Sequence, residues 1–400
     1  MTPPRRFTSL AALGAAAVFL LSWAGLHTAW YDDAEIVDTP VYERYGTAIE
    51  DGAVPYRDLE PEYPPGALPA FVVPALLSSG SDGFRDAFEA LMALFGVATV
   101  VLTAVALRGL GASRARSVAA LGLVAGFPLL LGSVVLTRFD LYPAALVAAA
   151  LAALVHGRDR LGSGLLGAAI AVKLYPGVLV PLAVAYVWRR RGRREALVCL
   201  GIAAVVVAAT FVPFLVLAPG GVAESIGRQL SRPLQIESLG ASLYLAAHHL
   251  FGLGVEMRSG HGSQNVHATG TGLAAVLASA VQVAVLVWIW LRRPATAAEL
   301  VRWSAAALVA FVALGKVLSP QFLIWLVPAV ALVAGLTGAR AAVLLAAALV
   351  LTQLWFPSRY WELARELDGN VVALVLARDL VLLGVLAVLV SSRRAAPRST

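Results

Sequence analysis

Ten of the chain's 24 acidic residues lie in one short stretch, residues 29–63, whose side chains could perform acid–base chemistry. Tyrosines and prolines are interleaved with the acids, which indicates a folded cap rather than a flexible acidic tail. A carboxylate held beside a membrane surface can take a proton from an incoming hydroxyl group. Asp38 is the first candidate for such a base, because it directly precedes "TPVYERYGTAIEDG", which predicts a short amphipathic helix. Asp32 and Asp33 are the alternates.

Lys173 and Lys316 are the only lysines among the 31 basic residues, and both lie inside apolar runs. A charge at membrane depth is expensive to bury, so an intramembrane lysine indicates a functional site. Cations that face an acidic cap are suited to an anionic lipid headgroup, and to a phosphate above all. The same reasoning admits Arg138 and Arg378.

The alternative for both lysines is structural. Each amine would then pair with a carboxylate, such as Asp140 or Asp379, or extend to the membrane interface. Two lysines far apart, each with its own carboxylate, would favour this interpretation. Lysines that share one cavity with Asp38 would favour a catalytic site.

Polar side chains in residues 218–270 supply amides, a carboxylate and histidines of the kind that hold sugar hydroxyls. Together with residues of the first acidic stretch and of the last polar turn, the candidates for binding sugar or acceptor are Tyr42, Glu62, Tyr63, Gln235, Glu237, His249, Gln264, Asn265 and Gln321. Adjacent histidines at 248 and 249 suggest a metal, but neighbouring side chains diverge on a helix and no carboxylate-rich ligand spacing accompanies them. No metal and no other cofactor is expected.

These residues must be positioned by membrane helices. The chain is 60% hydrophobic and only 14% charged, which excludes an ordinary soluble domain. Apolar runs of about 20 residues recur from end to end, so residues 1–400 are expected to form one all-α, polytopic membrane domain. The expected spans are 8–27, 87–107, 117–136, 141–156, 195–217, 271–291, 300–316, 319–336, 341–355 and 371–391.

Two apolar segments cannot be simple spans. Residues 161–188 begin and end beside arginines, so they predict a broken helical hairpin with its break at "KLYPG", where proline and glycine interrupt the helix. Residues 64–79 hold four prolines and predict a re-entrant or interfacial element. The prediction is about 12 membrane helices, within a range of 11 to 13 that depends on residues 64–79 and 241–253.

The arginines predict the orientation. If the N-terminus is cytoplasmic, the inner loops hold 19 arginines and the outer loops nine, as the positive-inside rule requires. Both termini are then cytoplasmic, and residues 29–63 and 218–270 are extracytoplasmic loops of a plasma-membrane protein, with an uncleaved first span. The net charge of +7 reflects this topology rather than nucleic-acid binding. One cysteine, Cys199, excludes an internal disulfide.

Six segments, taken in order, resemble a known family. They are "DTPVYERYG", "GAVPYRDLEPEYPPGA", "KLYPG", "RPLQIESLGAS", "HGSQN" and "GKVLSPQFLIWLVP", which extend over roughly residues 30–330. They are similar to the polyprenyl-phosphate-mannose-dependent α-(1,2)-mannosyltransferases of actinobacterial envelopes. That family includes the enzyme that mannosylates phosphatidylinositol mannosides, and it has the GT-C membrane superfold.

The resemblance implies transfer of a hexose, by family default mannose, from a polyprenyl phosphate to a lipid or glycan acceptor with inversion at C1. It implies an acidic base in the first external loop, which in this chain is Asp38 before "VY". The leaving phosphate needs a cation, and Lys316 or Lys173, helped by Arg378 or Arg232, would supply it.

Other functions remain open from the sequence. A flippase or transporter of lipid-linked sugars would also need intramembrane cations, although no paired broken helices in two halves are visible. A transferase of larger lipid-linked glycans or of phosphoryl groups, and a non-enzymatic structural role, are further alternatives.

Overall fold

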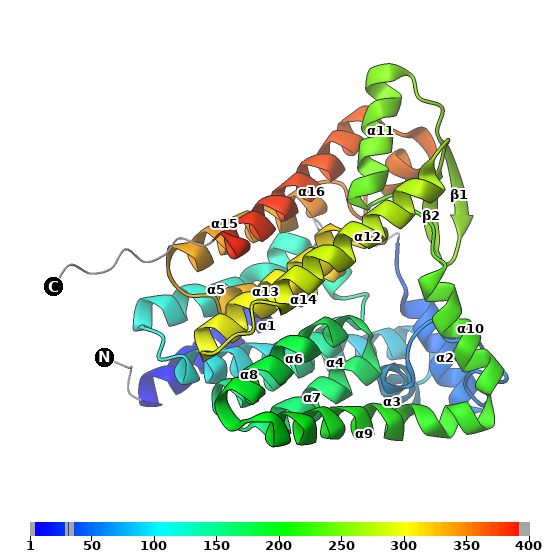
Figure 1. Cartoon of the computed structure of the whole chain (residues 1–400). Coiled ribbons are helices and arrows are strands. Elements are labelled where there is room, and N and C mark those ends of the chain that lie inside the picture. Colours follow the sequence, from blue (N-terminus) through cyan, green and yellow to red (C-terminus); the bar gives the residue numbers. More distant parts are fainter. Residues whose placement is uncertain (1–4, 29–30, 32–35, 392–400) are drawn as a thin grey trace.

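The computed structural model describes residues 5–28, 31 and 36–391. Most of these residues are helical (Figure 1). Seven of the described helices are long and apolar enough to cross a membrane, namely α1 (Arg5–Gly25), α4 (Gly80–Gly109), α5 (Arg114–Leu131), α9 (Arg193–Leu217), α12 (Thr271–Trp290), α15 (Gly335–Gln353) and α16 (Gly369–Val390). The chain is therefore a multi-pass membrane protein, as its sequence predicts.

Five shorter helices complete the bundle, namely α6 (Leu141–Val155), α7 (Asp159–Val172), α8 (Val180–Arg191), α13 (Ala297–Ala313) and α14 (Phe322–Ala331). With the seven long helices they make twelve of the sixteen α-helices in the described part of the chain. The helices α6, α13 and α14 bury most of their side chains, so they form the centre of the bundle. By contrast, α9 and α12 bury only three residues each, and their apolar faces are left for lipid.

Some expected boundaries were wrong by several residues. The span expected at 117–136 ends at Leu131, and a 3-10 turn, η2 (Ser133–Val135), follows it. The span expected at 319–336 is only the ten-residue α14. Both errors have one cause, because hydropathy marks apolar residues and says nothing of where a buried apolar segment stops being helical.

The segment expected as a broken hairpin corresponds to α7, the short η3 (Tyr175–Leu179) and α8. At the base of this hairpin Asp159 forms ion pairs with Arg190 at 3.4 Å and with Arg191 at 3.3 Å, so the start of α7 and the end of α8 lie together. At its tip Lys173 is extended, with φ −155° and ψ 139°, which ends α7. Lys173 is thereby placed at the opposite end of the hairpin from the arginines.

The first acidic stretch carries α2 (Thr39–Glu50), η1 (Pro65–Ala67) and α3 (Pro69–Leu77). The helix predicted after Asp38 is confirmed, and proline near its first position favours that start. Its buried Tyr42 stacks on Phe71 with ring centroids 4.6 Å apart. Gly46 permits this approach, because a Cβ there would lie 2.3 Å from the Phe71 carbonyl oxygen. At nine residues, α3 is too short to cross a membrane.

The loop 218–270 contains α10 (Pro219–Leu230), α11 (Leu239–Phe251), β1 (Glu256–Gly260) and β2 (Ser263–His267). The two strands form an antiparallel hairpin, with Gly260 opposite Ser263 and positive φ at both turn residues. The sequence analysis missed this hairpin, because its strands are polar and carry little of the alternation that marks a strand. In Figure 1, α2, α10 and the hairpin gather at one end of the bundle, and α1 begins at the other.

Candidate functional site

Asp38 precedes the first turn of α2, yet it makes no side-chain hydrogen bond to the backbone of that helix. An aspartate at this position ordinarily caps the helix with its carboxylate, but in this helix Pro40 has no N–H and the Val41 N–H donates to the Asp38 backbone carbonyl at 2.9 Å. Here one carboxylate oxygen, Oδ1, lies 3.2 Å from Nη1 of Arg138, and Oδ2 accepts a hydrogen bond from the Tyr42 hydroxyl at 3.3 Å. The side chain is 32% exposed. Asp38 is therefore held by two side chains and remains partly exposed.

Lys173 forms an ion pair at the tip of the hairpin. Its Nζ donates to Oδ1 of Asp140 at 2.6 Å, and the same oxygen accepts from the Trp325 indole at 2.6 Å. The ammonium also lies 4.6 Å from the Phe139 ring centroid and 5.1 Å from that of Trp325. Only 14% of the lysine side chain is exposed. The structure thus gives Lys173 the carboxylate partner of the structural alternative.

These pairs form one cluster with a balanced charge. Arg138 and Asp140 are two residues apart, so the cluster contains two cations and two carboxylates at short range. Tyr63 packs edge-on against Phe139, with centroids 4.8 Å apart, and its ring lies 5.8 Å from the Lys173 amine. Because its charges cancel, this cluster has no excess cation to offer an incoming phosphate.

Lys316 and Arg232 differ from Lys173 in their partners. The Lys316 amine donates to the Leu230 carbonyl at 2.8 Å, and the Arg232 guanidinium donates to the His261 carbonyl at 2.7 Å. Among the described residues, neither cation lies within ion-pair distance of a carboxylate. Leu230, which accepts the Lys316 bond, ends α10, and Arg232 follows it two residues later. Neither positive charge is therefore neutralised by a direct ion pair, although Arg232 lies near enough to Glu62 to affect its carboxyl.

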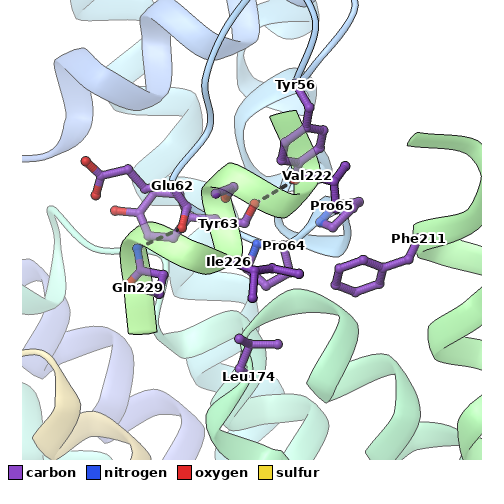
Figure 2. Close-up of a pocket in the computed structure, with 11 residues that line it drawn as sticks. Tyr56, Glu62, Tyr63, Pro64, Pro65, Leu174, Phe211, Val222, Ile226 and Gln229 are labelled. Carbon is purple, nitrogen blue, oxygen red and sulfur yellow. Dashed lines mark hydrogen bonds between the residues drawn. The ribbon is translucent and has the colours of Figure 1, made fainter. Parts of the chain in front are cut away.

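Glu62 and Tyr63 line a groove beside the cluster of Asp38, Arg138, Asp140 and Lys173 (Figure 2). In the figure Glu62 and Gln229 mark its polar end, and Phe211 of α9 marks the apolar end. The Gln229 amide donates to the Glu62 carbonyl at 3.1 Å. Leu174, next to Lys173, lines the same groove. The groove thus leads from lipid-facing apolar surface to the edge of the charged cluster.

The charges of Arg232 and of Asp38 both act on the Glu62 carboxyl. Burial raises the pKa of Glu62, the nearby Arg232 opposes that shift, and the nearby Asp38 adds to it. Its carboxylate also lies against the strand turn, where a Cβ on Gly262 would be 2.8 Å from Oε1. Glu62 therefore joins the first acidic stretch to the hairpin of the second loop.

A second buried network surrounds Arg378, which is fully buried in α16. Its guanidinium lies 2.8 Å from Asp379 and donates to the Glu237 carbonyl at 2.7 Å. Asp379 in turn accepts from the Ser242 hydroxyl at 2.8 Å. Like Lys173, Arg378 is therefore occupied by a carboxylate. The network ties α16 to α11 and to the loop before it.

Tyr360 lies between the two networks, in the linker between α15 and α16. Burial raises the pKa of its hydroxyl, the charge of Glu237 raises it further, and Arg138 lowers it. The charges of Glu237 and Arg138 thus both act on the Tyr360 hydroxyl, which places Glu237 in the neighbourhood of the Asp38 cluster. The sequence analysis did not single out Tyr360, because one tyrosine among several aromatics in "FPSRYWELARE" carries no distinguishing signal.

Glu237 predicts a pH-dependent stability. The side chain is 3% exposed, and burial raises its pKa from 4.5 to about 7 against the opposing charge of Arg378. Between these values the folded chain binds more protons than the unfolded chain, so stability falls as pH rises through this window. Thermal melting of the wild type in detergent should therefore drop more between pH 5 and 8 than that of Glu237→Gln. Equal pH dependence in the two proteins would contradict the shift.

The remaining predicted residues are more scattered. The Gln235 side-chain amide donates to the Ser319 hydroxyl at 2.9 Å. Its backbone N–H donates to the Lys316 carbonyl at 3.0 Å, so Gln235 lies beside Lys316. Gln321 directly precedes α14, next to Phe322. Asp32 and Asp33, the alternate bases, lie outside the described residues.

Three candidate sugar-binding residues already form hydrogen bonds to other groups of the chain. The Asn265 amide donates to the Gly260 carbonyl at 2.9 Å, and the Gln264 amide donates to the Ser259 hydroxyl at 2.7 Å, so both close the strand turn. The His249 ring hydrogen-bonds the Leu367 carbonyl at 2.7 Å. Their part in sugar binding stays a prediction.

Histidine, cysteine, aspartate and glutamate side chains do not gather in groups of three or more suited to a metal ion anywhere in the described part of the chain. Adjacent His248 and His249 turn to different carbonyl oxygens, those of Leu253 and Leu367. Metal-independent chemistry remains a prediction from the sequence.

Comparison with known proteins gives a family and a fold. The family model of glycosyltransferase family 87 matches residues 62–320, which is more than half of the 400-residue chain. No curated protein matches the chain. Among solved structures, a similar one is the crystal structure of ArnT from Cupriavidus metallidurans bound to undecaprenyl phosphate. The two share 16% sequence identity with a TM-score of 0.50, and the likeness covers 94% of this chain and 76% of ArnT. At that identity the likeness establishes the fold alone, and it confirms the predicted GT-C architecture.

Proposed function

Because the chain belongs to glycosyltransferase family 87 and has the GT-C fold of a multi-pass membrane protein, we propose that it uses a polyprenyl-phosphate-linked sugar. The transferred sugar is a hexose, with mannose as the first candidate from the resemblance of the sequence. The acceptor is a lipid or a glycan. Transfer takes place at the extracytoplasmic surface, and both termini are cytoplasmic.

One observation carries this proposal: Asp38 begins a helix without capping it. Its carboxylate is free of the helix, oriented by Arg138 and Tyr42, and open to substrate. In the proposed reaction the acceptor hydroxyl oxygen attacks C1 of the sugar while the bond from C1 to the phosphate oxygen breaks. Asp38 takes the hydroxyl proton. Attack opposite the leaving group inverts C1, so a β-linked donor gives an α-linked product.

The leaving polyprenyl phosphate is stabilised by Lys316 and Arg232. Neither cation forms an ion pair with a carboxylate among the described residues, whereas Lys173 and Arg378 are each paired. Lysine acts on phosphate as a point charge and arginine as a planar fork. The apolar groove beside Tyr63 supports a donor or acceptor that carries a long hydrocarbon chain.

The experiment is a transfer assay in nanodiscs with radiolabelled polyprenyl-phosphate mannose and total membrane lipids as acceptors. The expected result is label in a new lipid, with and without EDTA. Label that never leaves the donor, in a protein that remains folded, would contradict the proposed donor. Loss of transfer in EDTA that added Mg²⁺ restores would contradict metal-independent chemistry.

The same assay distinguishes the cations. We expect Lys316→Met and Arg232→Met each to lower kcat by about 10² to 10³, since each removes a charge that stabilises the leaving phosphate. Arg258→Met is the matched control, because this exposed arginine on β1 pairs with the neighbouring Glu256. Wild-type rates in both Lys316→Met and Arg232→Met would show that the phosphate binds elsewhere.

A further inference from the structure

The segment 138–140 forms an ion pair at each of its ends. Arg138 reaches Asp38 in the cap, and Asp140 reaches Lys173 at the hairpin tip. Phe139 between them is fully buried, and its ring lies 5.7 Å from that of Tyr42. Three consecutive residues, in the turn that leads into α6, therefore connect the cap to the hairpin.

The Arg138 guanidinium is the part of this connection that acts on Asp38. It is 4% exposed, and its Nη1 faces Asp38 while its Nη2 donates to the Ile36 carbonyl at 3.2 Å. It thus holds the carboxylate and also the backbone two residues before it. A planar guanidinium fixes both at once, which a lysine amine could not do with the same geometry.

The position of Asp38 depends on this contact, because α2 does not supply it. The carboxylate accepts nothing from the helix backbone, and the Tyr42 hydroxyl, at 3.3 Å, is a long hydrogen bond. The helix has little to offer the carboxylate, because Pro40 has no N–H and the Val41 and Tyr42 N–H groups already donate to the Asp38 carbonyl at 2.9 and 3.1 Å. Without Arg138, the side chain would lose the shorter of its two contacts and rotate freely. A base that rotates freely faces the acceptor for only part of the time.

We infer that Arg138 is a positioning residue that holds the Asp38 carboxylate in one orientation, directed at the acceptor hydroxyl. The inference rests on the proposed function of Asp38 as the base. It assigns Arg138 no contact with the donor, because its guanidinium is buried and shared between Asp38 and backbone carbonyl groups.

The test compares kcat and KM for Arg138→Gln and Arg138→Lys in the transfer assay. We expect Arg138→Gln to lower kcat about 100-fold, the size of effect that a misplaced catalytic group produces, with the KM for the donor unchanged. Arg138→Lys keeps the charge and should recover part of the rate. Arg116→Gln is the matched control, because that half-buried arginine donates to the Leu332 carbonyl on another part of the bundle.

A double-variant cycle with Asp38→Asn separates positioning from stability. If Arg138 acts through Asp38, then Arg138→Gln has no further effect on the residual rate of Asp38→Asn. If Arg138 only stabilises the fold, its effect is the same in both backgrounds. Melting temperatures and gel filtration are recorded for each variant, and a variant that fails to fold is replaced by Arg138→Lys in the same cycle.

The outcomes are distinct. A wild-type kcat in Arg138→Gln, a loss confined to the KM for the donor, or additive effects in the cycle would each overturn the inference while leaving the proposed function intact. A wild type without transfer would overturn the proposed function and this inference with it. An Asp38→Asn variant with full activity would move the base to Asp32 or Asp33 and would overturn this inference alone.

Discussion

Replacement of Asp38 by asparagine should lower kcat by about 10² to 10⁴, the contribution expected of one general base. The amide keeps the size and place of the carboxylate but cannot accept the acceptor proton. Donor binding should persist, because the proposed site assigns the phosphate to Lys316 and Arg232, which hydrogen-bond backbone carbonyls and not Asp38. The measurement is a steady-state transfer rate together with the donor dissociation constant from equilibrium binding.

Asp58→Asn is the matched control for this variant. It makes the same substitution in the same stretch, at an aspartate that pairs with its neighbour Arg57 and lies outside the cluster. We expect it to transfer at the wild-type rate. If Asp38→Asn also retained that rate, the base would have to be Asp32 or Asp33, and the two asparagine variants at those positions would identify it.

Lys173→Met should cause the largest loss of stability. The substitution leaves Asp140, which is fully buried, without its cation. Removing one partner of a buried ion pair costs about 3–5 kcal/mol, because the remaining charge has lost both water and its partner. Thermal melting in detergent measures this loss. Lys316→Met is the control, since its amine binds one carbonyl group near the surface, a bond that contributes about 1 kcal/mol.

The double variant Lys173→Met with Asp140→Asn tests the cause. It removes both charges, and the amide oxygen can still accept the Trp325 indole bond that Asp140 accepts at 2.6 Å. We expect most of the lost stability to return. A Lys173→Met variant as stable as the wild type would show that the pair does not stabilise the fold. A double variant that is stable but inactive would give Lys173 a part in the chemistry as well.

The features that the sequence predicts well are those with local signals. The start of α2 could be placed because proline and threonine follow Asp38, and the break at Lys173 because Pro176 and Gly177 interrupt a helix. The long spans follow from runs of apolar residues that need no knowledge of their neighbours. The twelve helices are therefore largely accessible to reasoning from the sequence.

The partners of the charged residues were not accessible in the same way. Lys173 and Asp140 lie 33 positions apart, just beyond the end of α7 and just before the start of α6, and the packing of these two helices brings them together. The sequence presents Lys173, Lys316, Arg232 and Arg378 as equivalent cations. The structure separates the two that are paired with carboxylates from the two that are not. The polar strand hairpin was missed for the related reason that its residues carry no apolar pattern.

The sparse burial of α9 and α12 has a consequence for kinetics. Both helices leave apolar faces for lipid, and Phe211 of α9 also lines the groove, so the proposed substrate with a hydrocarbon chain would reach the enzyme by diffusing within the bilayer. The concentration that governs its rate is then the mole fraction of substrate among the lipids, rather than the amount per litre of buffer. Diluting a fixed amount of donor with inert lipid or detergent should slow transfer as a competitive inhibitor would, even though nothing blocks the site.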